Sequence, residues 1–330
     1  MSNFPDMVTQ FGGAPVGSAY GWKHDSSVWF VDGTLGSSAN RGDRVDAAVA
    51  DISTAISNAS EYDVIYVLEH GFSGTDPVSY QETVANLTIP LAKDGLAIVG
   101  VTHQGVVGRP LSPYVMGMAA TATPILTINA PLCAIENLAF TGGWNNATTC
   151  TAGIYLPDNV EATAVAQGTS IYNCSFEDIS GTAAYGGIYA RGTWYVNITK
   201  TYYRNCVYAI NWGSSSSTSV SLYVDDVNTY ADTAAKVASD IYMYAQGTNG
   251  ILIKNANFAH PIGTATGVSG TNKYITGVGA EVGLITGVRM ASVSTVTIGA
   301  AGTGILAPAG VRYGDCYDGT GLLAVLDDTP

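Results

Sequence analysis

The chain has 330 residues, with 13 Lys or Arg against 26 Asp or Glu, and its formal net charge at pH 7 is −13. This balance argues against nucleic acid and membrane as partners, because a nucleic-acid groove and an anionic membrane both require clustered Lys and Arg side chains. Hydrophobic residues make up 47% of the chain and charged residues 12%, which excludes a disordered chain. The 39 Gly and 20 Tyr are residues of turns and strands, and they favour an all-β fold.

Residues 1–27 are predicted to form an extended N-terminal arm. They contain neither the basic nor the apolar region of a secretory signal, so synthesis in the cytoplasm is expected. Isolated apolar side chains suit a segment that becomes ordered on a partner. The candidate residues for this contact are Phe4, Met7, Val8 and Phe11.

A single helix is predicted at residues 43–59. Its apolar positions fall on one face: Val45, Ala48, Val49, Ile52, Ala55 and Ile56. Asp43 is the expected N-cap, because its carboxylate can accept hydrogen bonds from free backbone N–H groups. The strand DVIYVLE at 63–69 follows and is expected to enter the first coil.

An internal repeat occupies most of the remaining chain. Four segments align closely: AIENLAF (134–140), SIYNCSF (170–176), YYRNCVY (202–208) and LIKNANF (252–258). Three weaker copies share the frame, so that the central positions are 100, 137, 173, 205, 226, 255 and 287. A second motif recurs as GIYLPD (153–158), GIYARG (187–192), DIYMYA (240–245) and GILAPA (304–309), which gives each period at least two short strands.

Strands that recur once per period, with insertions confined to the turns, predict a parallel β-helix. Each residue then stacks on its equivalent in the next coil, about 4.8 Å away, and like side chains form columns. Asn at the central position suits a bend, and stacked Asn side chains can hydrogen-bond one another. Cys174 and Cys206 are expected in one interior column as reduced thiols. The helix is expected to cap the apolar end of the coil stack.

Two resemblances add to this interpretation. The sequence FVDG…GS…N, an Ala/Ile-rich helix and DVIYV together resemble the opening of pectate-lyase-like right-handed β-helix proteins, and the Asn-centred coils resemble the same superfamily. The first residues, MSNFPDMVTQFGGAPVGSAYG, are similar to the start of tailed-phage head proteins that carry such a β-helix. The expected organisation is an arm (1–27), a right-handed parallel β-helix (28–310) with its capping helix, and a C-terminal cap or tail (311–330).

Enzymes of the resembled superfamily use Asp clusters or paired Asp carboxylates on polysaccharides. Asp225–Asp226 is the one adjacent Asp pair before the C-terminal tail, but Asp226 takes the central repeat position, which favours a structural turn. Glu177–Asp178 is expected in a solvated loop. The four His residues are dispersed: His24, His70, His103 and His260. The sequence therefore predicts no catalytic residue, no metal site and no cofactor.

Four aromatic residues lie among Ser and Thr, namely Trp194, Tyr195, Tyr202 and Trp212. Core packing explains some of them. The others are candidates first for a subunit interface, where Tyr and Trp are enriched, and second for a wall on which sugars stack.

The leading hypothesis is a non-enzymatic structural virion protein, a head decoration (cement) protein of a tailed phage. It would form a homotrimer on the outer surface of the head, with the major capsid protein and its own copies as partners. The alternative is a polysaccharide-degrading or polysaccharide-binding β-helix protein, either a tailspike-like depolymerase or a lyase.

Overall fold

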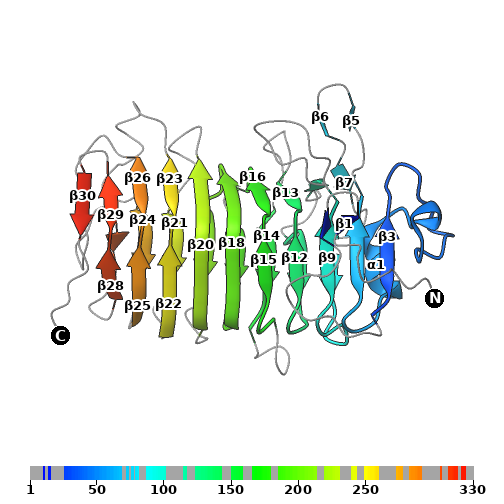
Figure 1. Cartoon of the computed structure of the whole chain (residues 1–330), viewed down its shortest axis with the longest axis horizontal. Coiled ribbons are helices and arrows are strands. Elements are labelled where there is room, and N and C mark those ends of the chain that lie inside the picture. The colour runs from blue at the N-terminus through cyan, green and yellow to red at the C-terminus, as the bar shows by residue number, and fades with distance from the viewer. Residues whose placement is uncertain are drawn as a thin grey trace.

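The computed structural model describes most of the chain, and it is a parallel β-helix, as predicted. The described residues are 10–11, 14–15, 26–68, 72–73, 76–77, 79–81, 87–101, 114–116, 123–142, 150–158, 166–179, 185–213, 219–230, 239–243, 249–259, 273–277, 282–291, 305–306, 311–318 and 321–324. Figure 1 shows the coils side by side along the long axis of the molecule, in chain order from the N-terminal to the C-terminal end.

Each full coil contributes strands to three parallel rows. Row 1 consists of β3 (Val28–Val31), β4 (Val64–Val67), β9 (Ala97–Gly100), β12 (Ala134–Glu136), β15 (Ser170–Tyr172), β18 (Trp194–Arg204), β20 (Val220–Tyr230), β22 (Asn249–Lys254), β25 (Val282–Thr286) and β28 (Val311–Gly314). Row 2 consists of β7 (Ser79–Gln81), β10 (Tyr114–Met116), β13 (Ala139–Thr141), β16 (Ser175–Glu177), the second halves of β18 and β20, β23 (Asn257–Ala259), β26 (Arg289–Ala291) and β29 (Cys316–Asp318). The long strands β18 and β20 join rows 1 and 2 into one sheet.

Row 3 is a separate sheet that closes the coil. It consists of β8 (Leu87–Ile89), β11 (Leu126–Ile128), β14 (Ala152–Leu156), β17 (Gly186–Ala190), β19 (Tyr208–Trp212), β21 (Ser239–Met243), β24 (Lys273–Gly277) and β27 (Ile305–Leu306). Two short antiparallel pairs lie outside the rows: β1 (Gln10–Phe11) with β2 (Ala14–Pro15), and β5 (Phe72–Ser73) with β6 (Asp76–Pro77).

The parallel pairing continues beyond residue 310. Strands β28 and β29 extend rows 1 and 2, so residues 311–318 form part of a coil where a C-terminal cap or tail was expected. Strand β30 (Gly321–Ala324) then pairs with β29 in the antiparallel sense. A reversal of this kind ends a parallel stack, because the next coil cannot continue in register.

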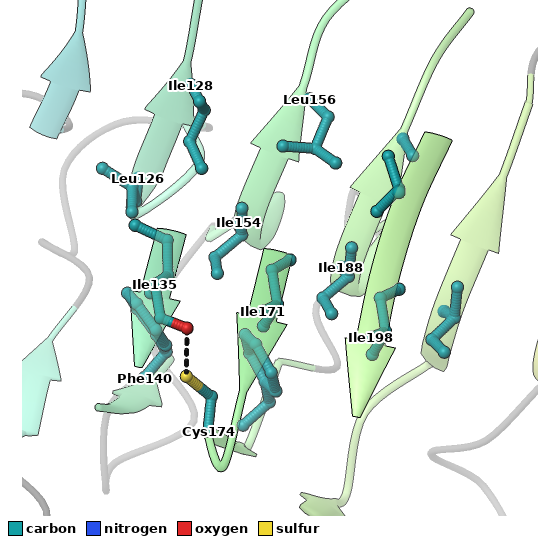
Figure 2. Close-up of a cluster of buried hydrophobic side chains, with 14 of the residues drawn as sticks. Leu126, Ile128, Ile135, Phe140, Ile154, Leu156, Ile171, Cys174, Ile188 and Ile198 are labelled. Carbon is teal, nitrogen blue, oxygen red and sulfur yellow. Dashed lines mark hydrogen bonds between the residues drawn. The ribbon is translucent and has the colours of Figure 1, made fainter. Parts of the chain in front are cut away.

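The core consists of columns of like side chains from successive coils. Row 1 contributes Ile65, Ile98, Ile135, Ile171, Ile198, Val224, Ile253 and Ile285, none more than 1% exposed. Row 3 contributes Leu126, Ile154, Ile188, Ile210, Ile241 and Ile275. Figure 2 shows side chains of both rows in the same interior. Each buried Ile contributes about 1.5–3 kcal/mol through the hydrophobic effect.

The chain bends between row 1 and row 2 at one left-handed residue per coil. This bend column has φ between 48° and 65° and consists of Asn137, Asn173, Lys200, Asp226, Asn255, Gly287 and Asp315. Asn173 Nδ2 donates to Asn137 Oδ1 at 2.7 Å, which confirms the expected bond between stacked Asn side chains. The bend role predicted for Asp226 is also confirmed.

The repeat frame was wrong at the segment YYRNCVY. Ile198 pairs with Ile171, and Tyr203 pairs with Phe176, so this segment belongs to row 2. Asn205 accordingly lies beside Asp178 and donates to its carboxylate at 3.0 Å. Both residues have left-handed backbone, which explains the error: the bend after row 2 selects the same residue types as the bend after row 1.

Cys174 and Cys206 do not share a column. Cys174 Sγ donates to the carbonyl of Ile135 at 3.6 Å, the contact drawn in Figure 2. Cys206 Sγ instead donates to the carbonyl of Phe176 at 3.5 Å, in the next bend. Both are free and buried, as expected. Each is a small apolar side chain that packs inside a different bend of the coil.

The helix begins later than predicted and is shorter. The predicted range 43–59 contains the short 3₁₀ helix η1 (Val45–Ala47) and the helix α1 (Ile52–Asn58). Between them Val49 forms a β-bridge with Val31, and its N–H donates to the carbonyl of Phe30 at 2.9 Å. This pairing with β3 overrides the helical periodicity of the preceding residues.

The predicted N-cap was also wrong. Asp51 caps α1, since its Oδ1 accepts a hydrogen bond from Thr54 N at 2.7 Å, whereas Asp43 forms an exposed ion pair with Arg41. On the buried side of α1, Ile52 and Ile56 join the core, and the helix packs against β3, β4 and β8. That α1 caps the end of the stack stays a prediction.

Candidate functional site

A group of polar side chains lies on the outward face of row 1 and at the adjoining bends. Side chains alternate along a strand, so Val224 points inward while its neighbours Tyr223 and Asp225 point outward. We call the group the polar strip, and it comprises Tyr172, Lys200, Tyr223, Asp225, Asp226, Lys254 and Asn255 from β15, β18, β20 and β22.

Asp225 is the centre of this strip. Its Oδ2 lies 3.0 Å from Lys254 Nζ and accepts a hydrogen bond from Tyr223 Oη at 3.1 Å. Its Oδ1 accepts a hydrogen bond from Asn255 Nδ2 at 2.9 Å. Partial burial works to raise the pKa of Asp225, but the hydrogen bonds from Asn255, Lys254 and Tyr223 outweigh it and hold the pKa below its ordinary value. Asp225 is therefore a carboxylate at neutral pH and a weak base.

Two lysines carry the positive charge of the strip, each beside a tyrosine. Lys200 Nζ donates to Tyr172 Oη at 3.1 Å, and Lys254 Nζ lies 5.1 Å from the centre of the Tyr223 ring. Hydrogen bonding to Tyr172 raises the pKa of Lys200, and hydrogen bonding to Tyr223 and Asp225 raises the pKa of Lys254. Both lysines stay protonated at neutral pH and can bind anionic or hydroxyl-rich ligands.

Glu136 lies in the same outward column, one coil before Tyr172. It is 6% exposed, and burial raises its pKa. The register places it three coils from Asp225, about 14 Å at the usual strand spacing. This column therefore holds a carboxyl group that retains its proton more readily than usual and, well apart from it, a carboxylate.

The other residues singled out in the sequence are scattered. Trp212 is fully buried in the core, whereas Trp194 and Tyr195 are exposed. Glu177 is buried in β16, so the expectation of a solvated loop was wrong there. The side chains of the proposed capsid-contact residues, Phe4, Met7, Val8 and Phe11, and the four His residues lie outside the described part of the chain.

Sequence reasoning missed Lys254 as a partner of Asp225, although the signal was present. In the repeat frame both residues directly precede the central position, in neighbouring copies of the repeat. Opposite charges at one position of adjacent coils predict an ion pair across the strands. Lys200 was missed for another reason, since the frame error at YYRNCVY hid its place in the bend column.

The described residues contain no cluster of three or more His, Cys, Asp or Glu that could hold a metal ion. None of the described helices is long and apolar enough to cross a membrane. What the strip offers is two ammonium groups, two phenol hydroxyls, an amide and two carboxyl groups, which together can bind and polarise a hydroxylated substrate.

Comparison with known proteins relates the fold to carbohydrate-active enzymes. An alginate lyase from Paenibacillus sp. str. FPU-7 has a TM-score of 0.52 at 15% identity, covering 88% of this chain and 98% of that one. The GH136 lacto-N-biosidase from Eubacterium ramulus has a TM-score of 0.50 at 10% identity, covering 88% of this chain and 56% of that one. The chain thus spans little more than half of the biosidase.

ORF18 of Geobacillus virus E2 has a TM-score of 0.39 at 13% identity, and the match covers 81% of this chain and 56% of that one. A TM-score this low supports no inference about this chain. No family model matches the chain, and no curated protein matches it. The more specific hypothesis of a head decoration protein gains no support from these likenesses.

The prediction of a non-enzymatic protein is corrected by these comparisons. It rested on the lack of a recognisable catalytic constellation, since Asp225–Asp226 was assigned to a structural turn, but the fold at TM-scores of 0.50 and 0.52 is that of a biosidase and a lyase. At 10% and 15% identity these likenesses establish the architecture. The chain has the parallel β-helix fold found among polysaccharide-active enzymes.

Proposed function

We propose that the protein is a polysaccharide-active enzyme that cleaves a uronate-containing glycan by β-elimination on the polar strip. The observation that carries this proposal is the pair of Lys–Tyr contacts, Lys200 with Tyr172 and Lys254 with Tyr223, on either side of Asp225. The likeness of the fold to an alginate lyase supports the choice of substrate class.

Hydrolysis fits the strip less well. A glycoside hydrolase needs two carboxyl groups roughly 5–10 Å apart, one of them protonated at working pH. The strip contains two carboxyl groups, Asp225 and Asp226, which are adjacent in β20. The pKa of Asp225 is lowered, so it holds no proton to donate, and Asp226 Oδ1 accepts a hydrogen bond from Asn228 Nδ2 at 3.3 Å in the bend. Glu136 is the carboxyl group with a raised pKa in this column, but about 14 Å separate it from Asp225 at the usual strand spacing.

β-Elimination needs groups that the strip contains. The proton next to the uronate carboxylate passes to a carboxylate of the strip, and the C–H electron pair forms a C=C bond as the glycosidic C–O bond breaks. The leaving oxygen takes up a proton from a phenol hydroxyl. Lys200 and Lys254 can neutralise the carboxylate, which makes that proton more acidic. Tyr172 accepts its hydrogen bond from Lys200 on oxygen, so its own O–H remains able to move a proton.

The test is incubation with alginate, pectate and a neutral glucan. We expect the ultraviolet absorbance of a C=C bond conjugated to carboxylate to appear with an acidic glycan. Tyr172→Phe should lower that rate about 10²–10⁴-fold, the usual contribution of a positioned proton donor or acceptor. Tyr155→Phe, in row 3, is the matched control and should keep the parental rate. New reducing ends without the absorbance would mean hydrolysis, and no cleavage at all would overturn the proposal.

The arm contacts at the capsid, the homotrimer and the location on a virion stay predictions. They are compatible with a glycan-cleaving enzyme carried on a particle. Co-sedimentation of the full chain with undecorated phage heads would test them separately from catalysis.

A further inference from the structure

A second column of left-handed residues precedes row 1 at the opposite edge from the polar strip. This corner column has positive φ throughout and consists of Tyr62, Gly95, Leu132, Gly168, Tyr195, Ser221 and Gly250. Residues with a Cβ atom are costly at such positions. In the left-handed backbone conformation the Cβ atom lies too close to the following carbonyl oxygen, which costs about 1–2 kcal/mol. Tyr62, Leu132 and Tyr195 therefore need a reason to be there.

For Tyr62 and Leu132 the reason is packing on the next coil. A Cβ atom on Gly95 would lie 2.3 Å from Tyr62 Cδ1, and one on Gly168 would lie 2.7 Å from Leu132 Cδ2. Each large side chain thus lies directly over a glycine. The pattern of large residue followed by glycine covers bare backbone with part of an apolar side chain, although Leu132 itself stays 54% exposed.

Tyr195 breaks this pattern. The next residue in its column is Ser221, which carries a side chain of its own, and Tyr195 stays 64% exposed. Trp194 beside it is 41% exposed. Neither ring stacks on another ring or on a cation within the described residues. Among the described residues, Tyr195 therefore lacks the contact with a glycine that Tyr62 and Leu132 make, although its backbone is left-handed like theirs.

The position of these rings relates them to the polar strip. Tyr195 and Lys200 are five positions apart on the same strand, β18, about 16 Å along an extended chain. The half-buried side chains of Asn197 and Thr199 lie between them on the outward side of the strand. Asn197 Oδ1 is buried there without a hydrogen-bond partner, so the accessible polar group between the two ends is the Thr199 hydroxyl together with the Asn197 NH₂ group. The outward face of β18 is therefore a polar track with a cation at one end and two exposed rings at the other.

We infer that Trp194 and Tyr195 form an aromatic subsite that holds a sugar ring of the glycan cleaved at the polar strip. This inference rests on the proposed function. A pyranose ring presents C–H groups that pack on an aromatic face, while its hydroxyl groups suit the Thr199 hydroxyl and the NH₂ group of Asn197. A subunit interface would need roughly 800 Å² per partner with an apolar centre, whereas polar Asn197 and Ser221 flank this pair.

The test uses Tyr195→Gly, which removes the ring and relieves the left-handed strain. Binding of alginate oligosaccharides, from the disaccharide to the hexasaccharide, is measured in the Tyr172→Phe background, where turnover should be slowed about 10²–10⁴-fold. We expect at least a fivefold loss of affinity for the longest oligosaccharides, no change for the disaccharide, and a melting temperature equal to or above that of the parent. Leu132→Gly, the same change in the same column, is the matched control and should keep the parental affinity for every length.

Each other outcome would overturn the inference. Equal affinity of Tyr195→Gly and its parent for all lengths would mean that the rings do not touch the glycan. Equal loss for the disaccharide and the hexasaccharide would contradict a subsite distant from Lys200. A change of oligomeric state with unchanged affinity would make the pair a subunit interface. Cleavage of acidic glycan without any effect of Tyr195→Gly would leave the proposed function standing and remove this subsite alone.

Discussion

Single left-handed residues determine where each coil bends. Asn, Asp and Gly accept this conformation at little cost, and they occupy six of the seven bend positions named above, Lys200 being the exception. Lys200 accepts the strain at the point where it contacts Tyr172. Strained residues of this kind tend to cluster at functional sites, which agrees with the place of Lys200 in the polar strip.

Replacement of Asn173 separates the two contributions of a bend residue. Asn173→Gly should lose only the hydrogen bond to Asn137, about 1 kcal/mol of unfolding free energy. Asn173→Ala should lose that bond and also carry the left-handed penalty, about 2–3 kcal/mol in total. Urea unfolding of both variants measures the difference, and equal stability of the two would contradict the role of backbone strain.

The residues at the bends could be assigned from the sequence only where neighbouring coils have similar lengths. Asn137 and Asn173 were aligned correctly because their coils are nearly equal in length. Asn205 was assigned to the wrong bend, since a shorter coil brings a row 2 motif to the spacing expected of row 1. The contacts of Asp225 depend on this register, and local sequence does not encode it.

At the scale of elements, α1 shows how strand pairing limits a helix. The apolar periodicity starts at Val45, but only the short η1 forms there, and the bridge between Val49 and Val31 interrupts the helix until Asp51. Helical periodicity alone could not show this, because the competing contact comes from β3. The inward columns, by contrast, were predictable, since Ile at one position of each coil is a repeated and strongly apolar signal.

Asp51 should stabilise α1 in a pH-dependent way. Burial works to raise its pKa, but hydrogen bonds from Thr54 and Ser53 outweigh this and lower the pKa below the ordinary 3.8. The stabilisation is therefore present above about pH 3.8 and is lost as the pH falls through the lower folded value. Asp51→Ala should cost about 1 kcal/mol at pH 7, the usual value of an N-cap. Thermal melts at pH 7 and pH 3 should show a smaller difference at pH 3.

The buried face of α1 should tolerate no charge. Ile52→Asp places a carboxylate among buried apolar side chains and should prevent folding or cause aggregation, because an unpaired buried charge is costly. Ser53→Asp adds the same charge on the exposed side of the same helix and is the matched control. Circular dichroism measures the folding of both variants and sedimentation measures their aggregation. A soluble Ile52→Asp protein with the parental melting temperature would show that folding does not require this face of α1.

For the whole molecule, the buried thiols and Tyr203 predict instability in alkali. Burial raises the pKa of Cys133, Cys150 and Cys174 from 9.0 to about 12, and it raises the pKa of Tyr203 well above 10.0. These groups ionise more readily when unfolded, so the stability is fully present below pH 9 and is lost as the pH rises towards 12. Urea midpoints should fall steadily as the pH rises from about 8.5, the ordinary pKa of a thiol, to about 11. A constant midpoint would contradict the burial of these groups.

The repeated bend column also makes coils interchangeable as units. Lys200 and Asp226 occupy the same position of successive coils, and so do Asn255 and Gly287. A deletion from Lys200 to Asp225 would join Thr199 to Asp226 and leave every inward column continuous, with both ends of the molecule unchanged. A deletion of one residue inside a strand would instead turn each following side chain to the wrong face. The gene for such a chain can therefore lengthen or shorten by whole coils, and the surface that meets a long substrate can change in steps while the fold stays the same.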